Sequence, residues 1–232
     1  MPRTENAFGS WLRGLPVKPG TPPVLLYDGT RKSNQHAHVA VLDVDVGPRD
    51  LQQCADAVMR LRAEYLFASG RAGDITFQLT SGDRADFARW RSGNRPFVTD
   101  SGVVWKRTGS FDGSYRSLRS YLDFVFTYAG TFSLARELAP LRDLSGMSPG
   151  DVFVHGGFPG HAAIVVDIAV QPATGRRVFL LAQSYMPAQE IHILRNPADP
   201  ALSPWYSSET DRHELVTPEW VFERTDLRSW PD

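Results

Sequence analysis

The residue types that could carry covalent chemistry in this sequence are one cysteine and a few histidines. Cys54 is the only cysteine among 232 residues, and apolar residues recur at helical spacing around it. This spacing predicts a helix over residues 50–68 with Asp50 as its N-cap. Because unpaired N–H groups and the helix dipole stabilise a thiolate, Cys54 is a candidate nucleophile with a lowered pKa. The alternative is a buried cysteine, since Cys54 also lies on the apolar side of its helix.

His161 is the candidate base for the same chemistry. It follows Gly160 and opens an apolar run that predicts a strand over residues 161–170. At the start of a strand an imidazole can face a cleft while the following residues pack in the core. A neutral imidazole there could accept the proton of Cys54 and return it to a leaving group. The alternative is a structural histidine that hydrogen-bonds to the preceding loop.

An imidazole that acts as a base needs a polar partner to orient it. Gln183 lies on the return strand of a predicted hairpin and comes beside His161 if the register allows. Otherwise its amide satisfies a buried backbone group. Asp167 shares the strand side of His161, but six residues of extended chain place it about 20 Å away. We therefore expect Gln183 to complete the candidate catalytic set.

Residues close to these three in the sequence are candidates for substrate binding. The amide of Gln53 could donate to an oxyanion or be solvated on the helix surface. Gly157 and Gly160 belong to a glycine-rich loop that we expect to shape a cleft, because no helix start follows it to bind a phosphate. The predicted substrate-binding residues are Gln53, Gly157, Gly160, Ser184, Tyr185 and Gln189.

A metal site has little support in the sequence. His36, His38, Asp43 and Asp45 lie close together, but no ordered ligand spacing recurs among them. An exposed edge strand explains the two aspartates as well. We therefore predict neither a metal nor a cofactor.

Composition limits the class of protein. The sequence has 25 Lys and Arg residues against 26 Asp and Glu, which gives no electrostatic footprint for nucleic acid or an anionic membrane. No apolar run reaches the roughly 18 residues of a spanning helix, so a soluble protein without an integral membrane segment is expected. The N-terminus lacks the apolar core of a signal peptide. A lone cysteine cannot form an intramolecular disulfide.

The pattern of apolar residues predicts mixed secondary structure in one domain. Residues 1–30 are predicted to form an irregular arm, and residues 31–232 a single α+β domain with helices packed on a mostly antiparallel sheet. Predicted helices cover 50–68, 84–91, 114–138 with an interruption at Gly130, and 218–227. Predicted strands cover 38–46, 75–79, 103–106, 151–155, 161–170, 178–184 and 190–194.

Four blocks of the sequence resemble a bacterial family. They read QCADAVMRLRAEYL at 53–66, YAGT at 128–131, GDVFV at 150–154 with PGHA at 159–162, and AQSYMPAQ at 182–189. These blocks are similar to domain-of-unknown-function family 4846, and the resemblance covers nearly the whole chain. The family has no established activity, so the resemblance implies no reaction. Because members often carry export signals, it implies a place in the periplasm or cell envelope, with the signal peptide absent from this sequence.

A second resemblance adds chemistry. The segments GDVFV and GHAAIVV are similar to the core of NlpC-type cell-wall peptidases and CHAP amidases, which have a papain-like fold. This resemblance implies a papain-like, NlpC-type arrangement with Cys54 as nucleophile, His161 as base and Gln183 in the place of the third polar residue. There are departures: 107 positions separate Cys54 from His161, and the segment 121–138 before the glycine–aspartate strand has no cysteine. Either the middle region is an insertion, or Cys54 is not the nucleophile.

These observations predict a thiol hydrolase of an amide or peptide bond, with bacterial cell-wall peptide or glycopeptide as its substrate class. The alternative is a non-catalytic protein that binds a glycan or peptide in the cleft around His161 and Gln183. Contact between the Cys54 thiol and the His161 imidazole separates the two, because hydrolysis requires it and binding does not.

Overall fold

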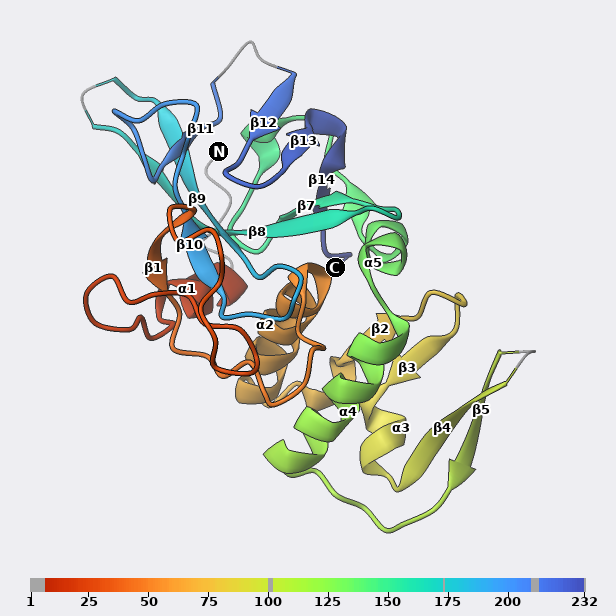
Figure 1. Ribbon diagram of the computed structural model, residues 1–232. Coiled ribbons are helices and arrows are strands. Elements are labelled where there is room, and N and C mark those ends of the chain that lie inside the picture. The colour runs from red at the N-terminus through yellow and green to blue at the C-terminus, as the bar shows by residue number, and fades with distance from the viewer. Residues whose placement is uncertain (1–6, 100–101, 173, 210–212, 232) are drawn as a thin grey trace.

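The chain folds around an antiparallel sheet with its helices gathered on one side. Figure 1 shows the computed structural model, which describes residues 7–99, 102–172, 174–209 and 213–231. The helices are α1 (Ala7–Arg13), α2 (Cys54–Ala68), α3 (Phe87–Arg91), α4 (Tyr115–Tyr128) and α5 (Thr131–Glu137), with 3-10 turns at Ala72–Asp74, Leu144–Gly146 and Arg224–Asp226. The α+β class expected from the sequence is confirmed.

Eight strands form the main sheet, and all of its pairs are antiparallel. Their order is β1-β10-β9-β8-β7-β14-β6, and β11 also pairs with β9. Three small two-stranded sheets, β2–β3, β4–β5 and β12–β13, complete the fold. The strands are β1 (His38–Val41), β2 (Thr76–Gln78), β3 (Arg84–Asp86), β4 (Asn94–Thr99), β5 (Gly102–Arg107), β6 (Ala139–Pro140), β7 (Val152–His155), β8 (His161–Val170), β9 (Arg177–Gln183), β10 (His192–Leu194), β11 (Tyr206–Ser207), β12 (Glu214–Val216), β13 (Val221–Glu223) and β14 (Leu227–Ser229).

Strand β8 lies in the middle of the sheet and is covered on both sides. Ala162 and Ile164 belong to the apolar cluster that contains the buried residues of α2 and α4. Ala163 and Val165 point the other way, into a second cluster that includes Phe222. Because both sides are buried, the strand reads as a continuous apolar run rather than an alternating one. Its predicted bounds, 161–170, are those of the structure.

The pairing between β8 and β9 contains an irregularity. Near the hairpin turn, Asp167 lies opposite Leu180, whereas further along Ile164 lies opposite Ala182. The sum of the paired residue numbers therefore changes by one, which is the mark of a β-bulge with an extra residue on β8. This shift decides which side chains of β9 lie on the same side of the sheet as the first residue of β8.

Helices α4 and α5 replace the single helical region predicted over 114–138, and Gly130 separates them. Leu118, Leu122 and Val125 of α4 are fully buried at helical spacing. The hydroxyl of Tyr121 donates to the Ala85 carbonyl at 2.6 Å, which links α4 to β3. This half of the molecule, with α3 and the β4–β5 hairpin, lies below the main sheet in Figure 1.

Three predicted boundaries near the N-terminal half are wrong. The predicted arm contains α1, because Phe8 and Leu12 are one helical turn apart and bury themselves beside α2. The strand predicted over 38–46 ends at Val41. The helix predicted from Asp50 begins at Cys54, with Gln53 as its N-cap, because the Asp50 carboxylate instead accepts hydrogen bonds from the Gln53 side chain and the Ala188 backbone.

The closing helix predicted over 218–227 is also wrong. This region forms β13, a 3-10 turn and β14. Phe222 is fully buried between the exposed residues Val221 and Glu223, which is the alternation of a strand. The Pro218 and Glu219 signals therefore mark a turn before a strand. The predicted polar helix over 84–91 is similarly divided between β3 and α3.

Packing of α2 against the sheet can be tested by shortening one side chain. Leu61 is fully buried in the cluster that α2 shares with β8. We expect Leu61→Ala to lower the free energy of unfolding by about 2–5 kcal/mol, because it leaves a cavity. Urea denaturation of the variant measures this loss. Val170→Ala, at a side chain 60% exposed, serves as a control and should change stability by less than about 0.5 kcal/mol; equal effects would contradict the described packing.

Candidate active site

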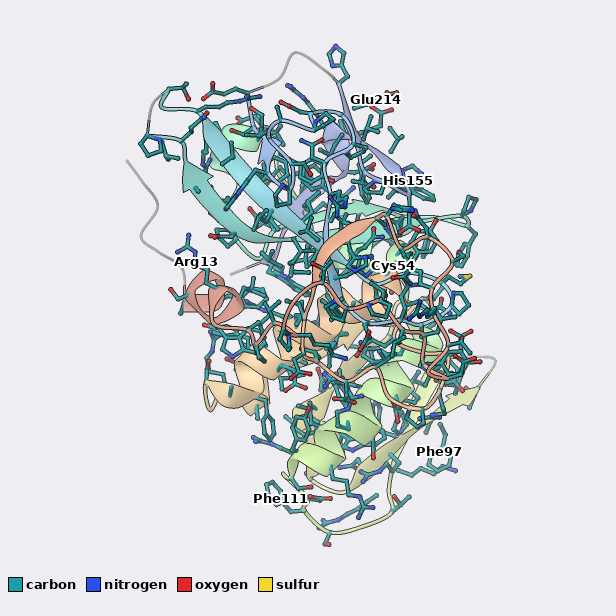
Figure 2. The ribbon with its side chains drawn as sticks, turned by 60° about the vertical axis from the view of Figure 1, so that its left-hand side comes forward. Arg13, Cys54, Phe97, Phe111, His155 and Glu214 are labelled. Carbon is teal, nitrogen blue, oxygen red and sulfur yellow. The ribbon has the colours of Figure 1, made fainter. Side chains whose placement is uncertain are left out.

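Cys54 is the first residue of α2 and is partly buried. Figure 2 shows it near the middle of the molecule, between the sheet and the helices. The backbone amides of Ala162, Ala55 and Cys54 itself lie close enough to the sulfur to lower the pKa of the thiol. Burial, followed by the charge of Asp56, outweighs them and raises the pKa of Cys54 to about 11. The lowered thiol pKa expected from the helix N-terminus is therefore wrong, because desolvation penalises the thiolate more than the amides stabilise it.

His161 is the first residue of β8 and is 1% exposed. Its Nε2 hydrogen-bonds to Oε1 of Gln183, the last residue of β9, at 2.7 Å. Aromatic rings surround the imidazole, with centroid distances of 4.8 Å to Tyr185, 5.4 Å to Trp220 and 5.6 Å to Phe222. Burial lowers the pKa of His161 to about 4. The imidazole is therefore neutral at pH 7, and its partner is the predicted one.

The Cys54 sulfur lies beside the backbone at the start of β8. The amide that contacts the Cys54 sulfur belongs to Ala162, the residue directly after His161. Tyr185, whose ring lies against His161, has a pKa that is raised by burial, by Glu219 and by the charge of Cys54. Among the described residues no hydrogen bond joins the thiol to the imidazole directly. The sulfur therefore lies beside the residue that follows His161, whose imidazole packs against Trp220 and Phe222.

A buried ion pair lies behind Gln183. Nε2 of Gln183 donates to Oε2 of Glu219 at 2.8 Å, and the ammonium of Lys32 donates to the same oxygen at 2.7 Å. The side chains of Lys32 and Glu219 are only 4% and 13% exposed. The sequence pattern does not single out either residue: Lys32 follows a loop rich in proline and glycine, and Glu219 resembles an acid in the first turn of a helix.

Two of the predicted substrate-binding residues are buried. Ser184 is fully buried, and its hydroxyl oxygen lies 2.9 Å from the Gln52 carbonyl oxygen and 2.8 Å from the Gln189 carbonyl oxygen, to one of which it donates its single proton. Gln189 is 1% exposed, and its amide donates to the carbonyl of Pro187. The Ser184 side chain links the segment after β9 to Gln52, two residues before Cys54.

The other predicted substrate-binding residues are Gln53, Gly157, Gly160 and Tyr185. Tyr185 is partly exposed beside His161, and the Gln53 amide donates to Asp50 at 3.1 Å. The Gly157 carbonyl accepts a hydrogen bond from Thr131, and a Cβ at Gly160 would come within 2.2 Å of the Thr131 hydroxyl oxygen. Glycine is therefore required before His161 by the close approach of α5.

The remaining candidate groups lie in other environments. Asp167 pairs with Arg13 at 2.5 Å. Asp45 pairs with Arg60 and Arg119, which explains its position better than a metal would. In residues 7–99, 102–172, 174–209 and 213–231, no group of three or more His, Cys, Asp or Glu side chains could hold a metal ion. No described helix is both long and apolar enough to cross a membrane.

The fold and this geometry define a mixed α+β protein with a cysteine, a histidine and a glutamine gathered at one end of an antiparallel sheet. The chain belongs to the family described as domain of unknown function 4846, which matches residues 1–229. No curated protein and no solved structure matches it. The papain-like arrangement thus stays a prediction.

The environment of the thiol predicts how Cys54 reacts. We expect alkylation of the native protein by iodoacetamide to accelerate with pH around an apparent pKa well above the 8.5 or so of a free thiol, because burial opposes the thiolate. The rate of carbamidomethylation, followed by mass spectrometry between pH 6 and pH 11, measures this pKa, and urea-denatured protein is the control. A midpoint below that of the denatured protein would contradict the environment described.

The buried imidazole predicts how stability depends on pH. The pKa of His161 is about 4 in the folded protein against 6.5 for the free group, so the unfolded chain binds more protons between these values. Its neutral state therefore stabilises the fold fully above about pH 6.5, and we expect this contribution, on the order of 3 kcal/mol, to be lost as the pH falls toward 4.

Urea denaturation at several pH values tests this expectation. His161→Phe lacks the titrating group, so its unfolding free energy should fall less steeply than that of the unmodified protein between pH 6.5 and pH 4. Parallel curves would mean that His161 titrates alike in the folded and unfolded chain, and that it is not buried.

Proposed function

We propose that this protein is a thiol hydrolase of amide bonds, with Cys54 as nucleophile, His161 as general base and Gln183 as the residue that orients the imidazole. The observation that carries the proposal is the 2.7 Å hydrogen bond between His161 and Gln183 beside a cysteine at the start of a helix. A nucleophile, a base and an orienting group are the minimum set for covalent acyl transfer, and the base and its orienting group are in contact here. Three distant parts of the sequence supply this set.

The reaction begins with a neutral pair. As the Cys54 sulfur attacks the carbonyl carbon, its proton passes to His161, and the carbonyl electrons move to the oxygen. The first N–H groups of a helix have no partners within that helix, so the backbone amides of Cys54 and Ala55 can donate to this oxyanion. When the C–N bond breaks, His161 returns the proton to the leaving amine, and a thioester remains on Cys54.

Water completes the cycle. His161 removes a proton from a water molecule that attacks the thioester, the C–S bond breaks, and the proton returns to the sulfur. Gln183 accepts a hydrogen bond from Nε2 throughout. The imidazolium that forms twice in each turnover thus keeps its orientation while its charge changes.

The substrate class follows from the resemblance to NlpC-type peptidases and CHAP amidases, which makes bacterial cell-wall peptide the first candidate. Two exposed apolar side chains are consistent with peptide binding beside the site. Phe158, 87% exposed, lies three residues before His161, and Met186, 67% exposed, follows Tyr185. Large exposed apolar side chains in the loops around a cleft favour contact with a ligand. Because the proposed substrate is cell-wall peptide, we also propose that the protein is located in the cell envelope.

A second candidate function is non-catalytic binding of a peptide or glycan in the same cleft. The observation that favours it is the direction of the two pKa shifts, since burial opposes both the thiolate and the imidazolium. A binding protein needs neither charged form. In both functions the ligand contacts Tyr185, Phe158 and Met186. The two functions differ only in whether Cys54 reacts.

Removal of the thiol separates the two functions. We expect Cys54→Ala to fold normally and to lower the rate of hydrolysis of purified cell-wall stem peptides by about 10⁴-fold or more, because no covalent intermediate can form. New amino groups and the masses of the fragments measure cleavage, and circular dichroism with urea denaturation checks the fold. Ser148→Ala removes a small polar group away from Cys54 and is the control.

Two outcomes would overturn the hydrolase. Cleavage that persists in Cys54→Ala would assign the reaction to another residue. Binding of the peptide with equal affinity to both proteins, without cleavage by the unmodified one, would establish the binding function in its place.

A further inference from the structure

The buried pair of Lys32 and Glu219 has no part in the reaction steps above, yet it lies directly behind the residue that orients the imidazole. We infer that Glu219, held by Lys32, is a positioning residue that fixes the amide of Gln183 in one orientation and thereby sets the tautomer of His161. This inference deepens the proposed function and rests on it only for its kinetic consequence.

The Gln183 amide could take either of two orientations beside His161. A glutamine side chain offers a carbonyl oxygen on one branch and an NH₂ group on the other, and either could face a neutral imidazole. A carboxylate accepts hydrogen bonds and cannot donate them. Because Glu219 Oε2 lies 2.8 Å from the terminal branch of Gln183 and also accepts from Lys32, the NH₂ group must face Glu219.

A second acceptor lies on the same side of the amide. Nδ1 of His192 donates to the Glu190 carbonyl at 2.9 Å, so Nε2 of this buried, neutral ring carries a lone pair. That nitrogen lies 3.5 Å from Nε2 of Gln183. Both groups that face the NH₂ branch are therefore acceptors, and a flipped amide would direct its oxygen at two lone pairs.

The orientation of Gln183 decides the protonation of His161. With the NH₂ group turned toward Glu219, the amide oxygen faces Nε2 of His161 at 2.7 Å. A carbonyl oxygen only accepts, so Nε2 must carry the proton of the neutral ring. Nδ1 then holds the lone pair, and this is the nitrogen left to accept the proton of Cys54.

Lys32 holds the Glu219 carboxylate beside the Gln183 amide. Its ammonium lies 2.7 Å from the carboxylate and 5.1 Å from the centre of the Tyr185 ring. Asn34 adds a third donor, at 3.4 Å from the other carboxylate oxygen.

Nitrogen-15 NMR of the protein labelled in histidine tests the inference without any substrate, since the two tautomers give distinct ring-nitrogen shifts. We expect His161 to carry its proton on Nε2 at pH 7.5, with assignment by a His161→Phe variant. Lys32→Met with Glu219→Leu removes both charges together, so no buried charge is left unpaired. In this double variant we expect a clear fraction of His161 with the proton on Nδ1.

A rescue variant distinguishes positioning from general loss of stability. Lys32→Met with Glu219→Gln restores a carbonyl oxygen that can accept from Gln183, so the tautomer should return to that of the unmodified protein. Arg60→Met with Glu64→Leu removes another buried pair, joined at 2.6 Å on α2, and should lower stability without changing the tautomer. With cell-wall stem peptide as substrate, the leucine variant should lose kcat at least tenfold with KM little changed, because no member of the pair touches the substrate.

The outcomes separate the inference from the proposed function. A proton on Nδ1 in the unmodified protein, or an unchanged tautomer in the leucine variant, would overturn the positioning role whatever the activity. The expected tautomers without any hydrolysis by the unmodified protein would support the positioning role and overturn the hydrolase.

Discussion

The pairing of β8 with β9 is the constraint on which the candidate site depends. Side chains opposite each other in an antiparallel pair share one side of the sheet, and a shift of one residue moves them to the other. The pairing near the hairpin turn, continued without interruption, would place Gln183 opposite Ile164, on the side of α2. The bulge places Gln183 opposite Ala163 instead, and so on the side of His161. One extra residue in a strand therefore creates the hydrogen bond that the site requires.

Because its surroundings are apolar, the hydrogen bond between His161 and Gln183 is strong. It also depends on the hydrogen bonds of the neighbouring polar side chains. Trp220 and Phe222 cover the imidazole, and Lys32, Glu219 and Gln183 continue the polar chain away from the cleft. In such an apolar environment every polar group needs a partner, and an orphaned one is costly. The same burial opposes charge on Cys54 and His161. The resting site therefore contains a neutral thiol and a neutral imidazole rather than a thiolate and an imidazolium.

The sequence predicts the centre of this site better than its surroundings. His161 is the first residue of β8, which begins and ends as predicted, and Cys54 lies in the predicted helix, which begins four residues later than predicted. Lys32 and Glu219 come from irregular segments and meet only through the tertiary fold. The sequence around Ser184 does not indicate that this residue is buried. A polar residue after a strand gives the same local pattern whether its side chain contacts a ligand or the backbone.

The order in which these segments occur along the chain has a consequence for synthesis. Cys54 leaves the ribosome long before His161 and Gln183, and Glu219 follows only near the end of the sequence. An incomplete chain thus has Cys54 without His161, and later His161 and Gln183 without the Glu219 carboxylate that faces the Gln183 amide. The long segments between these residues must close into loops, with a loss of conformational entropy, before the contacts of the site can stabilise the chain. We therefore expect the site to assemble late in folding.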